Sequence, residues 1–284
     1  MTQKIASETK IGAVALYVAS LERSLAFYQE KLGFARIDGG EGWTSLGAGE
    51  QVLLTLYEKA GAALSRGTTG LYHFAVLLPN RKSLAQLLVH MAEENVQFEG
   101  AADHGVSEAL YLSDPDGNGI ELYHDRRKAE WPVDDLKRLQ MTTEELDIDD
   151  LVLELRQDAP AWNGLPAGTR IGHVHLRVRE IPEAEAFYTG VLGFQLMQRY
   201  GSGAIFVSAG GYHHHIGMNT WSGVGAPPPP ETAAGLKNFE ILLPQSELEN
   251  LMQRLEAAQL AFTANEDGLL LHDPSMNTIQ IKVF

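Results

Sequence analysis

Three positions in this chain carry a metal-ligating side chain in one copy of a repeated segment and a different side chain in the other copy. The segments 11–34, 71–79 and 113–122 recur as 171–194, 236–244 and 272–281. The ligating members are His73, Glu121 and His173, and their counterparts are Asn238, Gln280 and Ala13. Imidazole and carboxylate groups bind iron, manganese, zinc and nickel. One member of each pair is therefore a candidate metal ligand and the other is not.

Two histidines and one carboxylate leave coordination positions open, as in non-haem Fe(II) sites that bind a substrate and oxygen together. A closed structural zinc site would need a fourth protein ligand, and the sequence offers no obvious one. The chain contains no cysteine, so thiolate sites are excluded. A single histidine on an apolar strand is more often a core residue than a ligand. It is the joint placement of the three that favours a metal site.

The elements that must position these residues form a repeated pattern. Residues 14–18 alternate like a strand, 21–33 show helical periodicity and end at a glycine, and 43–46 and 51–57 are typical of short strands. The same order follows from residue 72, with a helix over 83–94, strands near 97 and over 109–113, and a last strand over 120–123 after a DPDGN turn. Both units recur in the second half. We therefore predict an α+β fold of four βαβββ modules with curved, cup-like mixed sheets.

We place two similar domains at 8–126 and 169–284, joined by a connecting segment at 127–168. A Thr142 to Glu145 capping box predicts that a helix begins there, with its acidic residues on a solvated face. A second loop, 222–235, contains four consecutive prolines and should be stiff and extended. This loop is either a lid over a cavity or a plain connector.

The composition excludes several classes of function. The net charge of −15 argues against nucleic acid as a partner, because such binding depends on clustered basic residues. No apolar run approaches the roughly 20 residues that cross a bilayer, so we expect no membrane association. The first residues lack the apolar stretch of an export signal, and a cytoplasmic location is the default expectation.

In its repeat and its three candidate ligands, the chain resembles the vicinal oxygen chelate superfamily. Within that superfamily it resembles the type I extradiol dioxygenases, the catechol 2,3-dioxygenase group. The resemblance covers nearly all of the chain except the connecting segment. His173 in IGHVHL and His73 in LYHFAV match the two ligand histidines on opening strands. Glu121 in SDPDGNGIEL matches the ligand carboxylate after the DP-x-GN turn. The resemblance thus implies a site for Fe(II), with Mn(II) as the alternative.

The resemblance extends to residues beside the metal. His214 in YHHHIGMNTW matches the family's acid/base histidine on the last strand of module three, with His213 and His215 facing away by alternation. His104 and Tyr111 match the pair that hydrogen-bonds the substrate oxygens. His175, Tyr212, His213 and Trp221 are weaker candidates for contacts in the substrate pocket. Trp221 and Phe206 either line an aromatic pocket or pack in the core, and core packing is the favoured interpretation. His90, His124 and His272 are expected to be structural.

In one respect the chain departs from the best-known members, whose ligand-bearing modules are consecutive in the C-terminal half. Here the ligands come from modules two and three, on either side of the connecting segment. We infer that modules two and three pair and that one and four pair, giving a complete cup and a blank cup with Ala13, Asn238 and Gln280. If each half formed its own cup, only a homodimer could restore the triad. The oligomeric state stays open, a homo-oligomer included.

The implied reaction is cleavage of a catechol ring outside the diol with O2, giving a muconic semialdehyde-type product. The partners are then a small aromatic diol and oxygen, and His214 exchanges protons during the reaction. Two alternatives remain. A glyoxalase-like lyase or isomerase would need a second carboxylate on the last strand of module three, where the sequence has His214, Ile216 and Met218. A non-catalytic binding protein would need only a cup.

Overall fold

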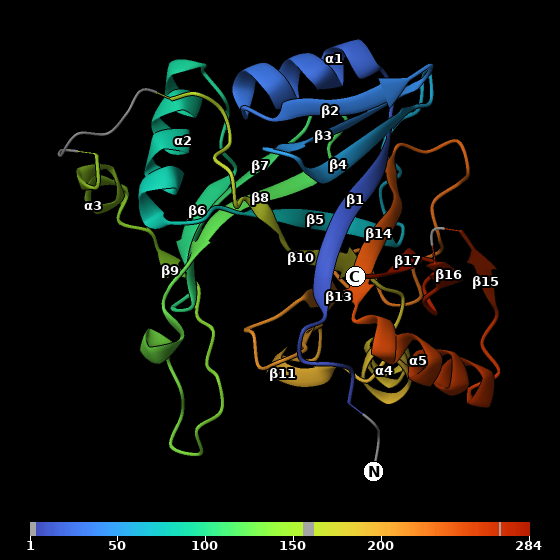
Figure 1. The fold of residues 1–284 in the computed structure, drawn as a ribbon. Helices are drawn as coiled ribbons and strands as arrows, with labels where there is room; N and C mark the ends of the chain where they lie inside the picture. The colour runs from blue at the N-terminus through green and yellow to red at the C-terminus, as the bar shows by residue number, and fades with distance from the viewer. Residues whose placement is uncertain (1–3, 156–161, 267) are drawn as a thin grey trace.

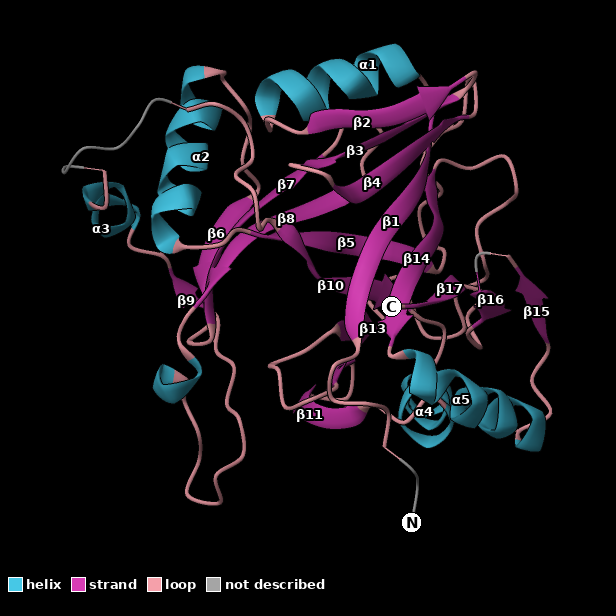
Figure 2. Ribbon diagram, viewed as in Figure 1, coloured by secondary structure: helices cyan, strands magenta, loops and turns pink. Residues whose placement is uncertain are grey.

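The computed structural model describes residues 4–155, 162–266 and 268–284. Its strands form two curved mixed sheets that lie side by side, with the helices at the periphery (Figure 1, Figure 2). One sheet has eight strands in the order β15-β16-β17-β14-β1-β4-β3-β2. The other has nine, in the order β11-β12-β13-β10-β5-β8-β7-β6-β9. Within the described residues, no helix is long and apolar enough to cross a membrane.

Each quarter of the chain contributes one opening strand, one helix and three further strands, with a small addition in the connecting segment. Module one contains β1 (Lys10–Val18), α1 (Leu21–Leu25) with the π-helical turn η1 (Ala26–Lys31), β2 (Ala35–Gly40), β3 (Trp43–Ala48) and β4 (Gln51–Glu58). Module two contains β5 (Gly70–Leu77), α2 (Arg81–Glu93), β6 (Gly100–Asp103), β7 (Ser107–Ser113) and β8 (Gly119–Asp125). The connecting segment contains the 3-10 turn η2 (Lys128–Glu130), β9 (Glu144–Glu145) and α3 (Ile148–Leu153). Module three contains β10 (Arg170–Arg177), α4 (Ile181–Glu185), η3 (Ala186–Val191), β11 (Gln195–Tyr200), β12 (Ala204–Ser208) and β13 (Ile216–Asn219). Module four contains β14 (Gly235–Leu243), α5 (Gln245–Ala257), β15 (Phe262–Asn265), β16 (Gly268–His272) and β17 (Thr278–Val283).

The predicted pairing of the modules is confirmed within a single chain. Strand β5 of module two pairs antiparallel with β10 of module three, and β1 of module one pairs antiparallel with β14 of module four. Each sheet therefore combines one module from each half of the sequence. The division at 8–126, 127–168 and 169–284 follows the repeat, and as a statement about domains it stays a prediction.

The turn that leads into β8 is fixed by a buried carboxylate. Asp114 accepts hydrogen bonds from the backbone N–H of Asn118, at 2.8 Å, and from the Tyr28 hydroxyl, also at 2.8 Å. Because Tyr28 lies in η1, this bond ties the helical segment of module one to the turn that precedes Glu121. The second half repeats these contacts with Asp273, Asn277 and Tyr188.

The connecting segment differs from its prediction. The helix does not begin at Thr142; it spans Ile148–Leu153, with Asp147 capping the N–H of Asp150 at 2.9 Å. Glu144–Glu145 instead form a short strand that pairs with β6. An aspartate N-cap satisfies the free N–H groups of the first turn as well as a capping box does, and the helix starts at that aspartate. The predicted exposure of the acidic residues is confirmed, and 156–161 lie outside the described residues.

The strand expected near residue 97 lies slightly later, at Gly100–Asp103. The predicted helix over 83–94 is found at Arg81–Glu93, and its N-cap is Asn80, whose side chain accepts a hydrogen bond from the N–H of Ser83. Gly33 ends the first helical segment with a φ of 73°, a left-handed conformation that favours glycine. These boundaries agree with the sequence to within a few residues.

A buried carboxylate beside the metal-bearing sheet provides a test of stability. Glu108 on β7 is almost fully buried and receives ion pairs from Arg81, at 2.7 Å, and Arg126, at 2.9 Å. Arg81→Ala leaves this charge with one partner, so we expect the free energy of unfolding to fall by about 1–3 kcal/mol. Arg199→Ala removes an exposed pair with Glu185 and should change it by less than about 1 kcal/mol. Equal urea unfolding midpoints for the two variants would contradict this account.

Candidate metal centre

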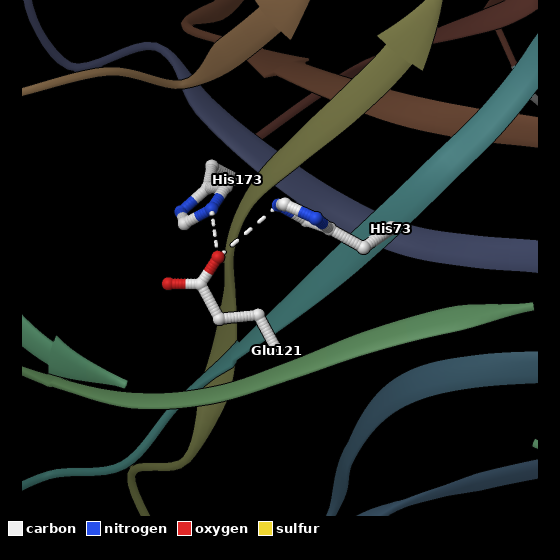
Figure 3. Close-up of side chains that lie close together, drawn as sticks. All are labelled: His73, Glu121 and His173. Carbon is white, nitrogen blue, oxygen red and sulfur yellow. Dashed lines mark hydrogen bonds and ion pairs between the residues drawn. The ribbon is translucent and has the colours of Figure 1, made fainter. Parts of the chain in front are cut away.

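The three predicted ligands converge on one point of the nine-stranded sheet. Oε2 of Glu121 lies 3.1 Å from Nε2 of His73 and 3.1 Å from Nε2 of His173 (Figure 3). Their ligand atoms all lie within 4.8 Å of one another, and all three side chains are buried. In the described part of the chain, this is the one group of three such side chains close enough to hold a metal ion.

Strand register brings the three side chains to the same face. Ala75 on β5 lies opposite His173 on β10 and also beside Glu121 on β8. Residues directly opposite in a sheet share a face, and His73 precedes Ala75 by two residues, so it shares that face as well. The three ligands thus come from three adjacent strands, as Figure 3 shows.

A bulge in β10 turns His173 toward this face. Ile171 lies opposite Val76, whereas His173 lies opposite Ala75, so β10 carries one extra residue between them. Simple alternation would put Ile171 and His173 on the same face, but the bulge sends Ile171 into the core and His173 into the cup. Gly172 is required there, because a Cβ at this position would lie 1.7 Å from the Tyr123 hydroxyl oxygen.

The electrostatics of the group suit a divalent cation. Burial opposes the charge of Glu121, but the adjacent His173 and His73 outweigh burial and hold the pKa of Glu121 well below its usual value. Burial lowers the pKa of His73, and the nearby Glu121 only partly offsets this. The lowered pKa favours a neutral imidazole at His73. Nε2 of His73 is buried and lies 3.1 Å from Oε2 of Glu121 without meeting the geometry of a hydrogen bond, although polar atoms rarely remain without one inside proteins. A carboxylate oxygen beside two imidazole nitrogens is a donor set that fits Fe(II) or Mn(II).

A cavity of about 520 Å³ opens beside the group. His73, Glu121 and His214 lie in its wall. The remaining lining is largely apolar or aromatic and comes from β5, β6, β7, β10, β11, β12, the connecting segment and the turn after β13. It includes Ala101, Ala102, Val106, Met141, Phe206 and Trp221. The loop 222–235, considered above as a lid, contributes no described residue to this lining.

His104 and Tyr111 form the predicted pair at the cavity wall. Nε2 of His104 lies 2.7 Å from the Tyr111 hydroxyl, and Nδ1 lies 2.7 Å from the Thr142 carbonyl oxygen. A carbonyl can only accept, so Nδ1 donates to it and Nε2 of a neutral His104 accepts from Tyr111. Burial and the nearby Glu121 charge raise the pKa of Tyr111 well above its usual value, so the phenol keeps its proton. It can donate that proton to His104 or to a substrate oxygen.

The histidine run before β13 is arranged differently from the prediction. His214 reaches the cavity, and its ring packs on His173 with centroids 4.0 Å apart. His213 and His215 do not simply face away, because β13 begins only at Ile216 and strand alternation does not apply before it. His213 is fully buried and bonded to His214 itself, with 2.8 Å between their Nδ1 atoms.

The weaker candidates divide between two places. His175 and Trp221 lie in the cavity wall, where their rings are 5.5 Å apart. Tyr212 is not among the described lining residues; its hydroxyl bonds to Asp125 and Tyr123. Phe206 is half-buried and lines the cavity, so the alternative of a pocket-lining residue is found and the favoured interpretation, core packing, was wrong.

Several lining residues could not be identified from the sequence. Met141 and Thr142 come from the connecting segment, and Gln198 on β11 holds the backbone of Met141 by hydrogen bonds of 2.6 and 3.0 Å. Nothing in the repeat could reveal them, since the connecting segment has no second copy. The one available signal was its position between the two ligand-bearing modules.

The other sheet contains the predicted blank cup. A cavity of about 510 Å³ there is lined by residues that include Ala13, Asn238 and Gln280, the counterparts of the three ligands. Two lysines lie in the same wall, Lys237 over the ring of Tyr57 and Lys282 paired with Glu240 at 2.6 Å. The two cups thus have similar volumes, while only one carries the ligand set.

Comparison with known proteins agrees with the repeat and the site. The chain is 46% identical over 275 residues to the catechol-2,3-dioxygenase of Bacillus subtilis (strain 168), covering 95% of each chain. Its fold resembles the cppA protein of Streptococcus pneumoniae, with a TM-score of 0.60 at 12% identity over 100% of each chain. It also resembles glyoxalase I of Zea mays, with a TM-score of 0.57 at 13% identity over 96% of this chain and 92% of the other. At such identities these two likenesses concern the fold alone.

The sequence model of one family matches both halves of the chain. It covers residues 10–122 and 170–280, which together form most of the sequence and include all three candidate ligands. The chain belongs to the glyoxalase/bleomycin resistance protein/dioxygenase superfamily.

Proposed function

We propose that this protein is an extradiol dioxygenase that uses Fe(II) and O2 to cleave the ring of a catechol-type substrate beside the diol. The observation that carries the proposal is the group of His73, Glu121 and His173 at the wall of a cavity large enough for an aromatic ring. The name of the Bacillus subtilis relative, at 46% identity over nearly the whole chain, supports the same reaction.

The lyase alternative requires a second carboxylate ligand. The positions that should supply it at the end of module three are His214, Ile216 and Met218. Ile216 and Met218 are apolar and fully buried, and His214 is an imidazole. The donor set thus favours the dioxygenase over the lyase.

When bound, the metal would bring the diol and oxygen together and conduct electrons between them. The chain's own residues do the rest. His104 and Tyr111 hydrogen-bond a substrate oxygen, and the protonated phenol of Tyr111 stabilises the deprotonated diol. His214 takes a proton and returns one later, as an imidazole can near neutral pH. Phe206, His175 and Trp221 place aromatic rings around the bound ring.

Anaerobic reconstitution tests the proposal. The protein would be loaded with Fe(II) and mixed with catechol in air while oxygen uptake and the yellow ring-fission product are followed together. We expect both signals in equal amounts, one O2 for each product. Bound iron with neither signal, across catechol and its alkyl and chloro derivatives, would favour the lyase or the binding protein. The same loading with Mn(II) compares the two metals.

The charge of the cavity predicts which catechols are accepted. Among the described residues that line it there is no lysine and no arginine. A carboxylate on the substrate would be buried without a partner, which costs several kcal/mol. We expect kcat/KM for 3-methylcatechol and 4-methylcatechol to exceed that for 3,4-dihydroxybenzoate by more than about a hundredfold. Equal values would show that a cation reaches the substrate.

A cytoplasmic location and a homo-oligomeric state remain proposals. Fractionation of cells and light scattering of the purified protein would test them.

A further inference from the structure

A chain of hydrogen bonds runs from the end of β8 to the candidate acid/base residue. Nε2 of His213 lies 2.9 Å from Oδ1 of Asp125, and Nδ1 of His213 lies 2.8 Å from Nδ1 of His214. His213 is fully buried, whereas His214 lies at the cavity wall. His213 therefore connects the carboxylate of Asp125 to the side chain that faces the substrate.

The chemistry of the end group fixes the direction of each bond. A carboxylate oxygen only accepts hydrogen bonds, so Nε2 of His213 must be the donor to Asp125. A neutral imidazole has a single N–H, which leaves Nδ1 of His213 as an acceptor. Nδ1 of His214 must then donate to it. In the neutral His214 ring this Nδ1–H is the single N–H. Nε2 of His214 is thus left with a free lone pair.

The carboxylate at the end of the chain is itself held in place. The Tyr212 hydroxyl donates to Asp125 at 2.9 Å, and the Tyr123 hydroxyl lies 2.8 Å from that of Tyr212. The ring of Tyr212 packs on His213 with centroids 4.0 Å apart. Tyr212 and His213 thus both donate to Asp125, and together these bonds fix the position of its carboxylate.

We propose that Asp125 and His213 are positioning residues that hold His214 in the tautomer with its proton on Nδ1, so that Nε2 is ready to accept a proton in the cavity. The proposal rests on the proposed function, in which His214 is the acid/base group. In histidine, the hydrogen bond made by one ring nitrogen sets the role of the other. Without the acceptor on His213, nothing in this network would keep the proton on Nδ1.

The tautomer can be measured directly by ¹⁵N NMR of the imidazole rings. The full-length protein would be labelled at histidine and loaded with Zn(II), a diamagnetic ion suited to the same ligands. We expect the His214 signals to show a protonated Nδ1 and an unprotonated Nε2. A proton on Nε2 of His214 in the unaltered protein would overturn the proposal, whatever the variants do.

Two variants of His213 distinguish the effect of its hydrogen bond to His214 from the effect of its ring packing. His213→Phe keeps a ring of similar size but has no acceptor, and we expect the His214 proton to move partly or wholly to Nε2. In His213→Asn the amide oxygen lies close to the former Nδ1 position and can accept the same bond, so the Nδ1 proton should be retained. His90→Phe makes the same exchange on α2 and should leave the His214 signals unchanged. An unchanged His214 tautomer in His213→Phe would also contradict the proposal.

Turnover by the His213 variants tests the positioning role, whereas turnover by the unaltered protein tests the proposed function. With Fe(II), we expect His213→Phe to lower kcat about a hundredfold with little change in KM for the catechol, and His213→Asn to recover part of the loss. If no catechol is cleaved by the unaltered protein, the proposed function fails, and the NMR result still decides the tautomer. Equal kcat in all three proteins would show that the network does not serve the reaction.

Discussion

Glu121→Gln should abolish iron retention while leaving the fold intact. Glutamine keeps the size of the side chain but removes the charge that His73 and His173 now surround. Even residues that only support metal ligands typically change affinity by 10- to 100-fold, so the loss of an anionic ligand should exceed about a hundredfold. Iron content after desalting should fall from about one per chain to near zero, and oxygen uptake with catechol should fall with it.

The control for this variant is the same exchange at a surface position. Glu50→Gln lies in the exposed turn between β3 and β4 and should retain iron and activity. Circular dichroism should give superimposable spectra for all three proteins, because the amide fits the space of the carboxylate. If Glu121→Gln keeps its iron and its turnover, Glu121 is not a ligand and the dioxygenase proposal loses its main support.

The triad was predictable because the repeat made the exceptions visible. Ala13, Asn238 and Gln280 show what each position looks like when no ligand is needed, so the two histidines and the glutamate stand out without any structure. The pairing of modules two and three then followed from the need to bring the ligands together. The same logic placed the blank cup, which the eight-stranded sheet contains.

The sequence could not predict the contacts that depend on local departures from regular geometry. Alternation assigned His213 to the far face, but this residue precedes β13, and its ring bonds to His214. The bulge at Gly172 is equally invisible, since a glycine in a strand indicates a close approach without saying of what. Here the close neighbour is the Tyr123 hydroxyl.

The connecting segment was unpredictable for a different reason. It has no second copy, so no comparison within the chain reveals which of its residues matter. Thr142 was expected to start a helix, yet its carbonyl accepts the hydrogen bond that orients His104. Every residue has a backbone carbonyl, so the residue type does not reveal which carbonyl accepts a hydrogen bond. The folded chain shows that this one sets the tautomer of His104 in the cavity wall.

His214→Ala should separate metal binding from chemistry. His214 packs on His173 but is not part of the ligand group, so we expect iron to be retained at about one per chain. General acid/base groups contribute typically 10²- to 10⁴-fold, and kcat should fall by about that factor. His272→Ala removes an imidazole from the blank cup and should leave both iron and kcat unchanged.

The pair of variants has a combined meaning that neither has alone. Loss of iron in Glu121→Gln, with retained iron and slow turnover in His214→Ala, assigns binding to the triad and proton transfer to the neighbouring imidazole. Unchanged kcat in His214→Ala would move the proton transfer elsewhere, and His104 with Tyr111 would be the next pair to test. Loss of iron in His214→Ala would instead mean that His214 supports the position of His173 through the contact of their rings.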